Sequence, residues 1–310
     1  MVAHMQRLLV LCLMTATLAW IWQCLSAPDS AGWACMLLAL LLLPHAAVLA
    51  LEFMLLAWIG RDPRVPRATT GQLLRAWWAE VWCASRVFGW RQPFCAQSRP
   101  DVAGVPGRRG VVLVHGFFCN RGLWNPWLQR LSLEGTPCTA PTLSPAFGGI
   151  DAYADAIDAA VRKLYRQTGL APVIVGHSMG GLAVRAWHVG DSRKPGVLAP
   201  VHAVVTVGTP HQGAWLARFA LSANARQMRM GSRWLSGLAA RECLQDQRRR
   251  DSGLPATRFI CFYGHADNIV FPASQGSLAG AENRHLRGVA HMQMLFHPEV
   301  WRTMNDLLLE

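Results

Sequence analysis

The chain begins with two long apolar runs and continues as a more mixed sequence. The first run covers about residues 8–25, and the second covers residues 33–59 with interruptions at Pro44 and Glu52. Each run is long enough to cross a hydrocarbon core about 30 Å thick. We therefore predict that residues 1–70 form a membrane anchor with two transmembrane helices. Glu52 is interpreted either as a functional intramembrane acid or as an interfacial or interhelical polar contact.

The charges that flank these runs predict how the chain is oriented. Residues 26–32 contain Asp29 and neither Lys nor Arg, whereas Arg7 precedes the first run. Four arginines follow the second run, at positions 61, 64, 67 and 75. Because basic residues favour the cytoplasmic side, we expect an integral protein of a bacterial inner membrane whose catalytic domain faces the cytoplasm. The first run alone also fits a signal peptide.

Residues 71–94 change to an amphipathic pattern that is rich in tryptophan. Apolar side chains fall close to one face at helical spacing: Leu73, Leu74, Trp77, Trp78, Val81, Trp82 and Phe88. Such a helix fits the headgroup region of a membrane, and it fits equally well against the rest of the protein. Residues 95–109 are rich in Pro and Gly and predict a linker. Residues 71–109 are thus expected to form an amphipathic helix and a linker.

From residue 110 onward, short apolar strands alternate with helices. The strands are predicted at Val111–Val114, Pro172–Val175, Val201–Val207 and Phe259–Tyr263. The helices are predicted at Leu123–Leu133, about 150–164, Gly181–Trp187 and Pro298–Leu309. This alternation is typical of a parallel sheet with helices on both faces. We predict that residues 110–310 form one α/β catalytic domain.

Composition adds a strong positive charge and little sign of a cofactor. Lys and Arg number 30 against 18 Asp and Glu, which gives a net charge of +12. This charge fits attraction to an anionic membrane surface or compositional drift toward arginine. No nucleic-acid-binding motif appears, so we expect no nucleic-acid partner. The nine cysteines include no Cys-x-x-Cys pair, and we expect neither a metal nor a cofactor; unpaired thiols suit a reducing compartment.

The strongest chemical motif is Gly176-His177-Ser178-Met179-Gly180. An apolar strand leads into it, and a helix-compatible run leaves it. A serine on such a strand-to-helix turn takes strained backbone angles, and the flanking glycines relieve the crowding. The turn exposes the hydroxyl group, which needs a base to take its proton. The motif therefore predicts that Ser178 is a catalytic nucleophile.

These residues resemble the α/β-hydrolase superfamily, and within it the bacterial triacylglycerol lipases and esterases. The similar stretches are His115-Gly116-Phe117, Gly176–Gly181, Val207–Gly213 and a late Asp and His. Together they span nearly all of residues 110–295. The resemblance implies an α/β-hydrolase fold, with a mostly parallel central sheet, helices on both faces and a small cap after the sixth strand.

The order of catalytic residues in that superfamily is nucleophile, acid and then histidine. Asp267 follows a predicted strand and matches the acid, and His291 lies before the last predicted helix and matches the base. The rivals are Asp246 and Asp251 for the acid, and His265, His285 and His297 for the base. The resemblance also implies that the backbone N–H groups of Phe117 and Met179 form the oxyanion hole. His115 and His211 are interpreted as structural.

Large apolar residues near these motifs are candidates for substrate binding. They are Phe118, Trp124, Trp127 and Trp215. Residues 214–240 fall where this fold accepts a cap, and an apolar cap suits an acyl chain. Each of these side chains also fits ordinary packing of helices on the sheet.

We therefore expect a serine carboxylic-ester hydrolase, a lipase or esterase that cleaves lipid-like or other hydrophobic acyl esters through an acyl-enzyme on Ser178. The alternatives are an acyl thioesterase or acyltransferase with the same triad, and an inactive membrane scaffold. The expected partners are the hydrophobic ester and membrane lipids, and the sequence gives no indication of the oligomeric state.

Overall fold

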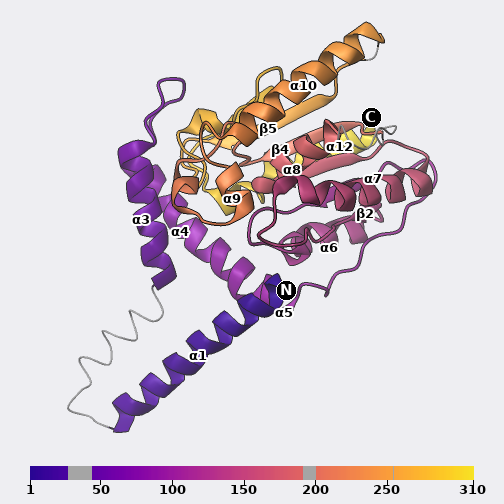
Figure 1. Cartoon of the computed structure of the whole chain (residues 1–310). Helices are drawn as coiled ribbons and strands as arrows, with labels where there is room; N and C mark the ends of the chain where they lie inside the picture. The colour runs from indigo at the N-terminus through magenta and orange to yellow at the C-terminus, as the bar shows by residue number, and fades with distance from the viewer. Residues whose placement is uncertain (27–43, 191–199, 254) are drawn as a thin grey trace.

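The centre of the computed structural model is a six-stranded parallel sheet (Figure 1). The structure describes residues 1–26, 44–190, 200–253 and 255–310. The strands are β1 (Val111–Val114), β2 (Cys138–Thr139), β3 (Val173–His177), β4 (Ala203–Val207), β5 (Arg258–Gly264) and β6 (Glu282–Leu286). Their order across the sheet is β2-β1-β3-β4-β5-β6, and each neighbouring pair is parallel. The predicted α/β class and the parallel sheet are confirmed.

Alternate residues of the buried strands face opposite sides of the sheet, and helices cover both sides. On one side, Val112, Ile174 and Val204 share a core cluster with residues of α7 (Ala154–Thr168) and α8 (Met179–His188). On the other side, Leu113 and Val175 share a cluster with residues of α6 (Asn125–Leu133) and α12 (Pro298–Leu309). Two separate hydrophobic cores, one on each face, thereby fix the positions of the strands and of the loops at their ends.

The remaining elements of the hydrolase part are short, apart from one insertion. Single turns of 3₁₀ helix are η3 (Arg121–Trp124), η4 (Ile150–Tyr153) and η6 (Ala273–Gly276), and α11 (His291–Met294) is one helical turn. The insertion lies between β4 and β5 and contains η5 (Trp215–Phe219), α9 (Ala223–Gln227) and α10 (Arg233–Asp251). The cap was expected after the sixth strand. Among the described residues the first strand of the sheet is β1, so the insertion follows the fourth strand, β4.

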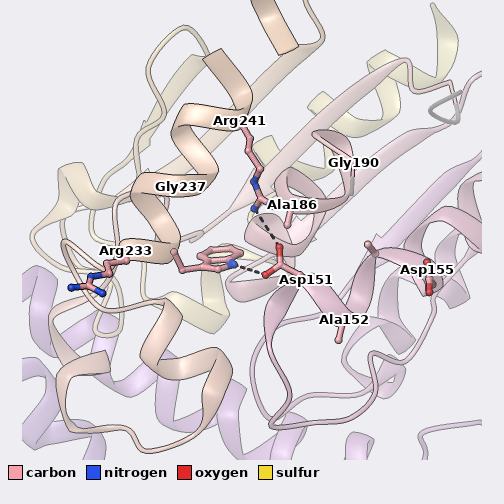
Figure 2. Close-up of a pocket in the computed structure, with 10 residues that line it drawn as sticks. Asp151, Ala152, Asp155, Ala186, Gly190, Arg233, Gly237 and Arg241 are labelled. Atoms are coloured by element: carbon pink, nitrogen blue, oxygen red, sulfur yellow. Dashed lines mark hydrogen bonds and ion pairs between the residues drawn. The ribbon is translucent and has the colours of Figure 1, made fainter. Parts of the chain in front are cut away.

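A cleft of about 520 Å³ lies between this insertion and the helices on the sheet (Figure 2). Figure 2 shows the Asp151 carboxylate at its centre, where it accepts a hydrogen bond from the Trp234 indole N–H. Arg241 pairs with the same carboxylate at 3.3 Å. Neither Ser178 nor His291 lines this cleft. We interpret it as the seam along which α10 rests on the sheet helices.

The N-terminal region is helical, and its first helix projects away from the sheet (Figure 1). It contains α1 (Val2–Ser26), α3 (Pro44–Ile59), α4 (Thr70–Arg86), the π-helical turn η2 (Val87–Arg91) and α5 (Gln92–Phe94). Among the described residues, one helix is long and apolar enough to cross a membrane, over Val2–Gln23. The second predicted span begins at residue 33, outside the described residues, and its described part is the 16-residue α3. The structure thus gives one candidate span and not clearly two.

Helix α4 packs on the hydrolase part through small side chains. Its N-terminus is a capping box, in which Thr69 and Gln72 each bond the other's backbone N–H. Ala76, Glu80 and Ala84 repeat every fourth residue and are buried. The large side chains of Trp78 and Trp82 are 65% and 58% exposed, so the predicted apolar face is not wholly covered by the hydrolase part.

The N-terminal helices share a core with loops of the hydrolase part. Phe53, Leu56 and Ala76 form one buried cluster with Ala266, Phe271 and Ala290. The predicted linker is attached as well, since Asp101 pairs with Arg121 at 2.7 Å. The helices are therefore a structural layer of the hydrolase and do more than tether it.

Candidate active site

Ser178 lies on the turn between β3 and α8, and its backbone is strained as the motif predicts. Its φ and ψ angles are 55° and −128°, a region that residues other than glycine rarely adopt. Its N–H donates to the Val207 carbonyl at 2.8 Å. A Cβ atom at Gly180 would lie 2.4 Å from the carbonyl oxygen of Val114. Only glycine at position 180 lets the turn lie this close to β1.

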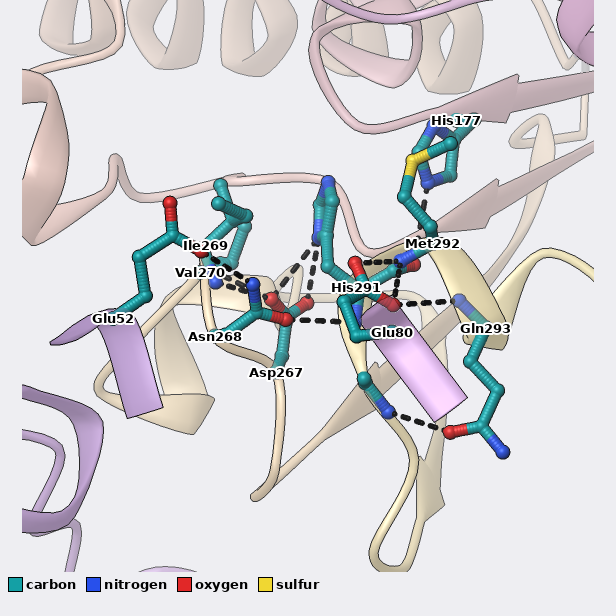
Figure 3. Close-up of polar contacts among 11 residues, drawn as sticks. Glu52, Glu80, His177, Asp267, Asn268, Ile269, Val270, His291, Met292 and Gln293 are labelled. Carbon is teal, nitrogen blue, oxygen red and sulfur yellow. Dashed lines mark hydrogen bonds and ion pairs between the residues drawn. The ribbon is translucent and has the colours of Figure 1, made fainter. Parts of the chain in front are cut away.

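Asp267 and His291 come from different loops and meet in a buried contact (Figure 3). Asp267 follows β5, and His291 is the first residue of α11. The Nδ1 atom of His291 lies 3.0 Å from each carboxylate oxygen of Asp267. The N–H groups of Ile269 and Val270 donate to Asp267 Oδ1 at 2.9 and 2.8 Å. The carboxylate is thus held in place and fixes the orientation of the imidazole.

The charges around His291 decide its affinity for a proton. Burial by itself lowers the pKa of His291, but the charge and hydrogen bond of Asp267, together with the charge of Glu80, outweigh burial and raise this pKa. The ring of His177 lies beside that of His291, with centroids 4.9 Å apart, and its Nε2 atom is 3.4 Å from the His291 carbonyl oxygen. Burial and then the charge of His291 lower the pKa of His177 well below its usual value. His177 is therefore a neutral neighbour.

Ser178 and His291 line one cavity of about 300 Å³, which we call the catalytic cavity. Its other walls are mostly apolar and include Leu49, Ala84, Phe88, Phe117, Phe118, Ile269 and Met292. Asp267 does not line it and lies behind His291. The structure therefore brings together the three residues that the sequence selected as nucleophile, acid and base.

The loop after β1 passes directly against Ser178. A Cβ atom at Gly116 would lie 2.9 Å from the Ser178 Cβ, so Phe117 follows at the edge of the nucleophile. Met179 is the first residue of α8, and its N–H has no acceptor within that helix. The two backbone groups that the resemblance assigns to the oxyanion hole thus lie on the two segments that flank Ser178.

His115 anchors this loop. Its Nε2 atom accepts a hydrogen bond from the Leu143 N–H at 2.9 Å. Burial lowers the pKa of His115 to about 4, which keeps the ring neutral and able to accept. His211 is also buried, and its Nε2 atom lies 2.9 Å from Thr206 Oγ1. Both contacts agree with the structural interpretation of these histidines.

The rival acids and bases lie elsewhere. His265 Nδ1 and His285 Nε2 are 3.0 Å apart, and neither residue lines the catalytic cavity. His297 caps α12 by accepting the Glu299 N–H at 3.3 Å. Asp246 and Asp251 are on α10 in the insertion. Position in the fold therefore favours Asp267 and His291.

Three of the four residues proposed to bind substrate do not reach the catalytic cavity. Phe118 lines it. Trp124 and Trp127 are 0% and 3% exposed and pack edge to face in the core beside α12, because η3 and α6 turn these rings toward the sheet. Trp215 stacks on Phe271 in the core shared with α3 and α4. No residue of the insertion at 214–240 lines the catalytic cavity.

The N-terminal helices supply polar contacts to the active-site loops that sequence reasoning missed (Figure 3). The Glu80 carboxylate of α4 accepts the N–H groups of Met292 and Gln293, at 2.9 and 3.1 Å. Burial raises the pKa of Glu80 to about 7, against the opposing effects of His291 and of these two N–H groups. The only feature of the sequence that points to this contact is that Glu80 is the single acidic residue in a largely apolar helical run.

Two further contacts come from α3 and α1. Glu52 of α3 accepts a hydrogen bond from Asn268 Nδ2 at 2.7 Å, and Asn268 Oδ1 accepts the His291 N–H at 3.2 Å. Gln6 of α1 donates from Nε2 to the carbonyl oxygen of Phe118 at 2.9 Å. Glu52 thus makes a polar contact with the loop that carries Asp267, a partner that neither interpretation of the sequence named.

No group of three or more His, Cys, Asp or Glu side chains is placed to bind a metal ion within the described parts of the chain. The chemistry that the arrangement supports is that of a serine, a histidine and a buried carboxylate. Such a set activates a hydroxyl group as a nucleophile.

Comparison with known proteins agrees with this geometry. No curated protein matches the chain. The mature lipase BlEst2 of Bacillus licheniformis superposes with a TM-score of 0.52 at 17% identity, over 67% of this chain and 95% of that one. Lipase B of Aspergillus fumigatus superposes with a TM-score of 0.52 at 15% identity, over 66% of this chain and 55% of that one.

Identities this low show a shared fold and nothing finer. The match in sequence is to a family profile, and it covers residues 111–304. That range includes Ser178, Asp267 and His291 and is more than half of the chain. The chain therefore belongs to the alpha/beta hydrolase family.

Proposed function

We propose that this protein is a membrane-attached serine hydrolase that cleaves hydrophobic carboxylic esters, with Ser178 as nucleophile, His291 as base and Asp267 as acid. One observation carries the proposal: Ser178 on its strained turn and His291 line the same apolar cavity, and Asp267 holds His291 Nδ1 from behind. A serine, a histidine and a carboxylate that orients the histidine are the groups that acyl transfer to a serine uses, which supports the proposal.

The reaction proceeds through an acyl-enzyme. His291 Nε2 takes the proton of the Ser178 hydroxyl as Oγ attacks the ester carbonyl carbon. The alcohol then leaves with that proton. A water molecule, deprotonated by His291, attacks the acyl-enzyme, and the acid is released as His291 returns this proton to Ser178 Oγ. Asp267 keeps the proton of the imidazole on Nδ1 and stabilises its charged form.

The negative charge that forms on the carbonyl oxygen needs donors in place before the reaction. The backbone N–H groups of Phe117 and Met179 take this role. Loss of one such donor costs roughly a hundred- to a thousandfold in rate. Two hydrogen bonds hold the loop at 115–118, one from the Leu143 N–H to His115 and one from Gln6 to the Phe118 carbonyl, and they therefore support catalysis indirectly.

Membrane attachment through α1 is part of the proposal. Leu8, Leu18 and Trp22 on α1 are 63%, 64% and 75% exposed, as suits a helix surrounded by lipid. Its N-terminal part is bound to the rest of the protein. Gln6 donates to the Phe118 carbonyl of the hydrolase part at 2.9 Å, and Arg7 donates to the Pro93 carbonyl of α5 at 3.1 and 3.0 Å. These contacts favour a retained anchor over a signal peptide that is removed.

The proposed location is the cytoplasmic side of a bacterial inner membrane. Arg61 and Arg67 follow α3 where the chain returns to the hydrolase part, which suits the positive-inside rule. The described cysteines are free thiols, which suits a reducing compartment.

A fluorophosphonate probe tests the catalytic assignment on the full-length chain in detergent. We expect the unchanged protein to be labelled and Ser178→Ala to remain unlabelled. Ser132→Ala, at an exposed serine of α6, serves as the matched control and should label normally. Labelling that persists in Ser178→Ala, or is absent from the unchanged protein, would contradict the proposal.

Matched ester and thioester substrates then separate the esterase from the thioesterase alternative. The ester and the thioester carry the same acyl group, so the ratio of their two kcat/KM values reports the preferred leaving group. We expect the ester to be the better substrate.

A further inference from the structure

The wall of the catalytic cavity opposite the hydrolase loops is built by the N-terminal helices. Leu49 of α3, Ala84 of α4 and Phe88 of η2 line the cavity together with Ser178 and His291. The insertion at 214–240, where the fold places a cap, contributes no lining residue. A group bound at Ser178 therefore contacts the N-terminal helices.

A second hollow adjoins this wall. It is a groove of about 480 Å³ between α1, α3 and α4, which we call the α1 groove. Its α1 side consists of residues at helical spacing on one face: Leu9, Val10, Leu13, Met14, Thr17 and Leu18. The groove is within the size range of about 300–1,000 Å³ that ligand pockets occupy. None of its described lining residues is Asp, Glu, Lys or Arg.

The two hollows meet at shared side chains. Ala84 and Phe88 line both the catalytic cavity and the α1 groove. A ligand that starts at Ser178 and is longer than the cavity has to pass these two side chains to enter the α1 groove. From Leu9 to Leu18 the groove follows α1 for about 14 Å, at a rise of about 1.5 Å per residue.

We propose that the acyl chain of the substrate lies in the α1 groove while its carbonyl group reacts at Ser178, so that the N-terminal helices bind long-chain acyl esters. This rests on the proposed ester-hydrolase function. An acyl chain is narrow and apolar, and it gains from burial in an uncharged groove. A polar alcohol part gains nothing there and is left at the hydrolase side of the cavity.

The position of the groove also suits a substrate that comes from a bilayer. Leu9 and Leu18 line the groove and are 56% and 64% exposed. They lie on the helix that we propose is surrounded by lipid. A lipid acyl chain thus enters the groove from the hydrocarbon phase without crossing water.

Acyl-chain length tests the proposal in the full-length chain. The substrates are a series of soluble monomeric esters from acetyl to long-chain acyl. We expect kcat/KM to rise about fourfold for each methylene group that enters the groove, the gain typical of a buried CH₂.

Gly89 provides the blocking variant. It lines the α1 groove but not the catalytic cavity, and a Cβ atom there meets nothing within 4 Å. Gly89→Phe should remove the gain for long chains and leave acetyl-ester hydrolysis unchanged. The matched control is Gly71→Phe, at an exposed glycine on α4 that also has open space and lines neither hollow.

A second variant blocks the groove from its other side. Thr17 on α1 lines the groove, so Thr17→Phe should have the same effect as Gly89→Phe. A rate that is independent of chain length in the unchanged protein, or a long-chain gain that survives in both variants, overturns the proposal.

A cross-linking probe locates the chain directly. A long-chain alkyl fluorophosphonate with a diazirine near its free end is first attached to Ser178, and light then links the diazirine to its neighbours. We expect links to residues 9–18 of α1 or to residues 84–89. Links to residues 214–240 would show that the insertion binds the chain, and the proposal would be wrong.

The probe also separates this inference from the proposed function. Failure to attach to Ser178 at all contradicts the serine-hydrolase function. Attachment followed by links outside the α1 groove contradicts the acyl-chain site alone.

Discussion

His291 lies among negative charges from two parts of the chain. Asp267 contacts its ring at 3.0 Å, and Glu80 acts from α4 through the backbone that carries His291. Their charges raise the pKa of His291 against the effect of burial. Because the base must be neutral to accept a proton, hydrolysis should increase as the pH rises through this pKa. Residues far apart in sequence thus set the acidic limb of the pH profile.

Replacement of Asp267 tests the direct contact. In Asp267→Asn the imidazole loses the acceptor that fixes its tautomer, and we expect kcat to fall about 10⁴-fold. The acidic limb of the remaining activity should move to lower pH, because the charge that raises the pKa of His291 is gone. Asp246→Asn on α10 is the control, and a rate for Asp267→Asn within tenfold of the unchanged enzyme contradicts the assignment.

Replacement of Glu80 tests the contact made through the backbone. In Glu80→Gln the amide oxygen, placed where Oε2 lies, still accepts the N–H groups of Met292 and Gln293 at 3.1 Å, but the amide NH2 group then faces the Met292 N–H that Oε1 accepts, so the loop keeps its hydrogen bonds only in part. Burial raises the pKa of Glu80 to about 7, so only its ionised fraction acts on His291, and loss of that charge should move the acidic limb to lower pH by less than one unit. The measurement is the pH dependence of kcat/KM, with Glu134→Gln on the exposed surface as control. An acidic limb at the same pH as in the unchanged enzyme would show that Glu80 acts only as a hydrogen-bond acceptor for the loop.

At the scale of elements, helix α8, which directly follows Ser178, is bound to the insertion by an ion pair. Arg185 is 3% exposed and pairs with Glu242 of α10 through two hydrogen bonds, at 2.8 and 2.7 Å. The guanidinium also donates to the His211 carbonyl at 2.9 Å. A buried cation of this kind depends on its partner. The insertion therefore stabilises the helix that begins at Ser178, although it does not line the catalytic cavity.

Loss of this partner should be costly. Glu242→Ala leaves Arg185 buried with its charge unpaired, and we expect the free energy of unfolding to fall by about 3 kcal/mol. Glu134→Ala removes an exposed partner of Arg130 and should cost about 1 kcal/mol or less. Denaturant unfolding of both variants provides the comparison, and equal losses would contradict the special role of the buried pair.

Elements with a clear apolar pattern were predictable, and those without one were not. The strands at 111–114 and 259–263 are buried runs, and the structure has them almost where they were predicted. β6 was missed because Glu282–Leu286 is a polar strand at the sheet edge, where one side is open to solvent. Trp124 and Trp127 were assigned to the site because a sequence cannot tell which face of a turn points inward.

The candidate triad was predictable because its order and its turn geometry are local properties. The contacts of Gln6, Glu52 and Glu80 with the active-site loops join residues separated by 112, 216 and 212 positions. No local pattern encodes such contacts. They depend on the tertiary fold, which places the N-terminal helices beside the loops at the strand ends.

At the scale of the whole molecule, the N-terminal helices and the hydrolase form one folded unit. Phe53 and Leu56 are buried against Ala266 and Phe271, and burial of each large side chain is worth about 1.5–3 kcal/mol. Removal of the N-terminal helices would also leave the loop at His291 without its contact to Glu80. The catalytic part is thus not expected to be stable alone.

A chain that starts at residue 95 tests this unity. We expect it to aggregate or to label with fluorophosphonate far more slowly than the full-length chain, because it exposes an apolar surface and frees the His291 loop. Soluble yield and labelling rate in the same detergent are the measurements. A monomeric truncated chain that labels at the full rate would show that the helices only anchor the enzyme.

The hydrogen bond from Gln6 to the Phe118 carbonyl has a consequence for regulation. It joins a helix that we propose lies in lipid to the loop beside the nucleophile. Coupling between two such sites is reciprocal. We therefore expect a bilayer whose thickness or tension displaces α1 to displace the loop as well, and an inhibitor that orders the loop to hold α1 in return. The rate of hydrolysis is then expected to depend on the state of the membrane through Gln6.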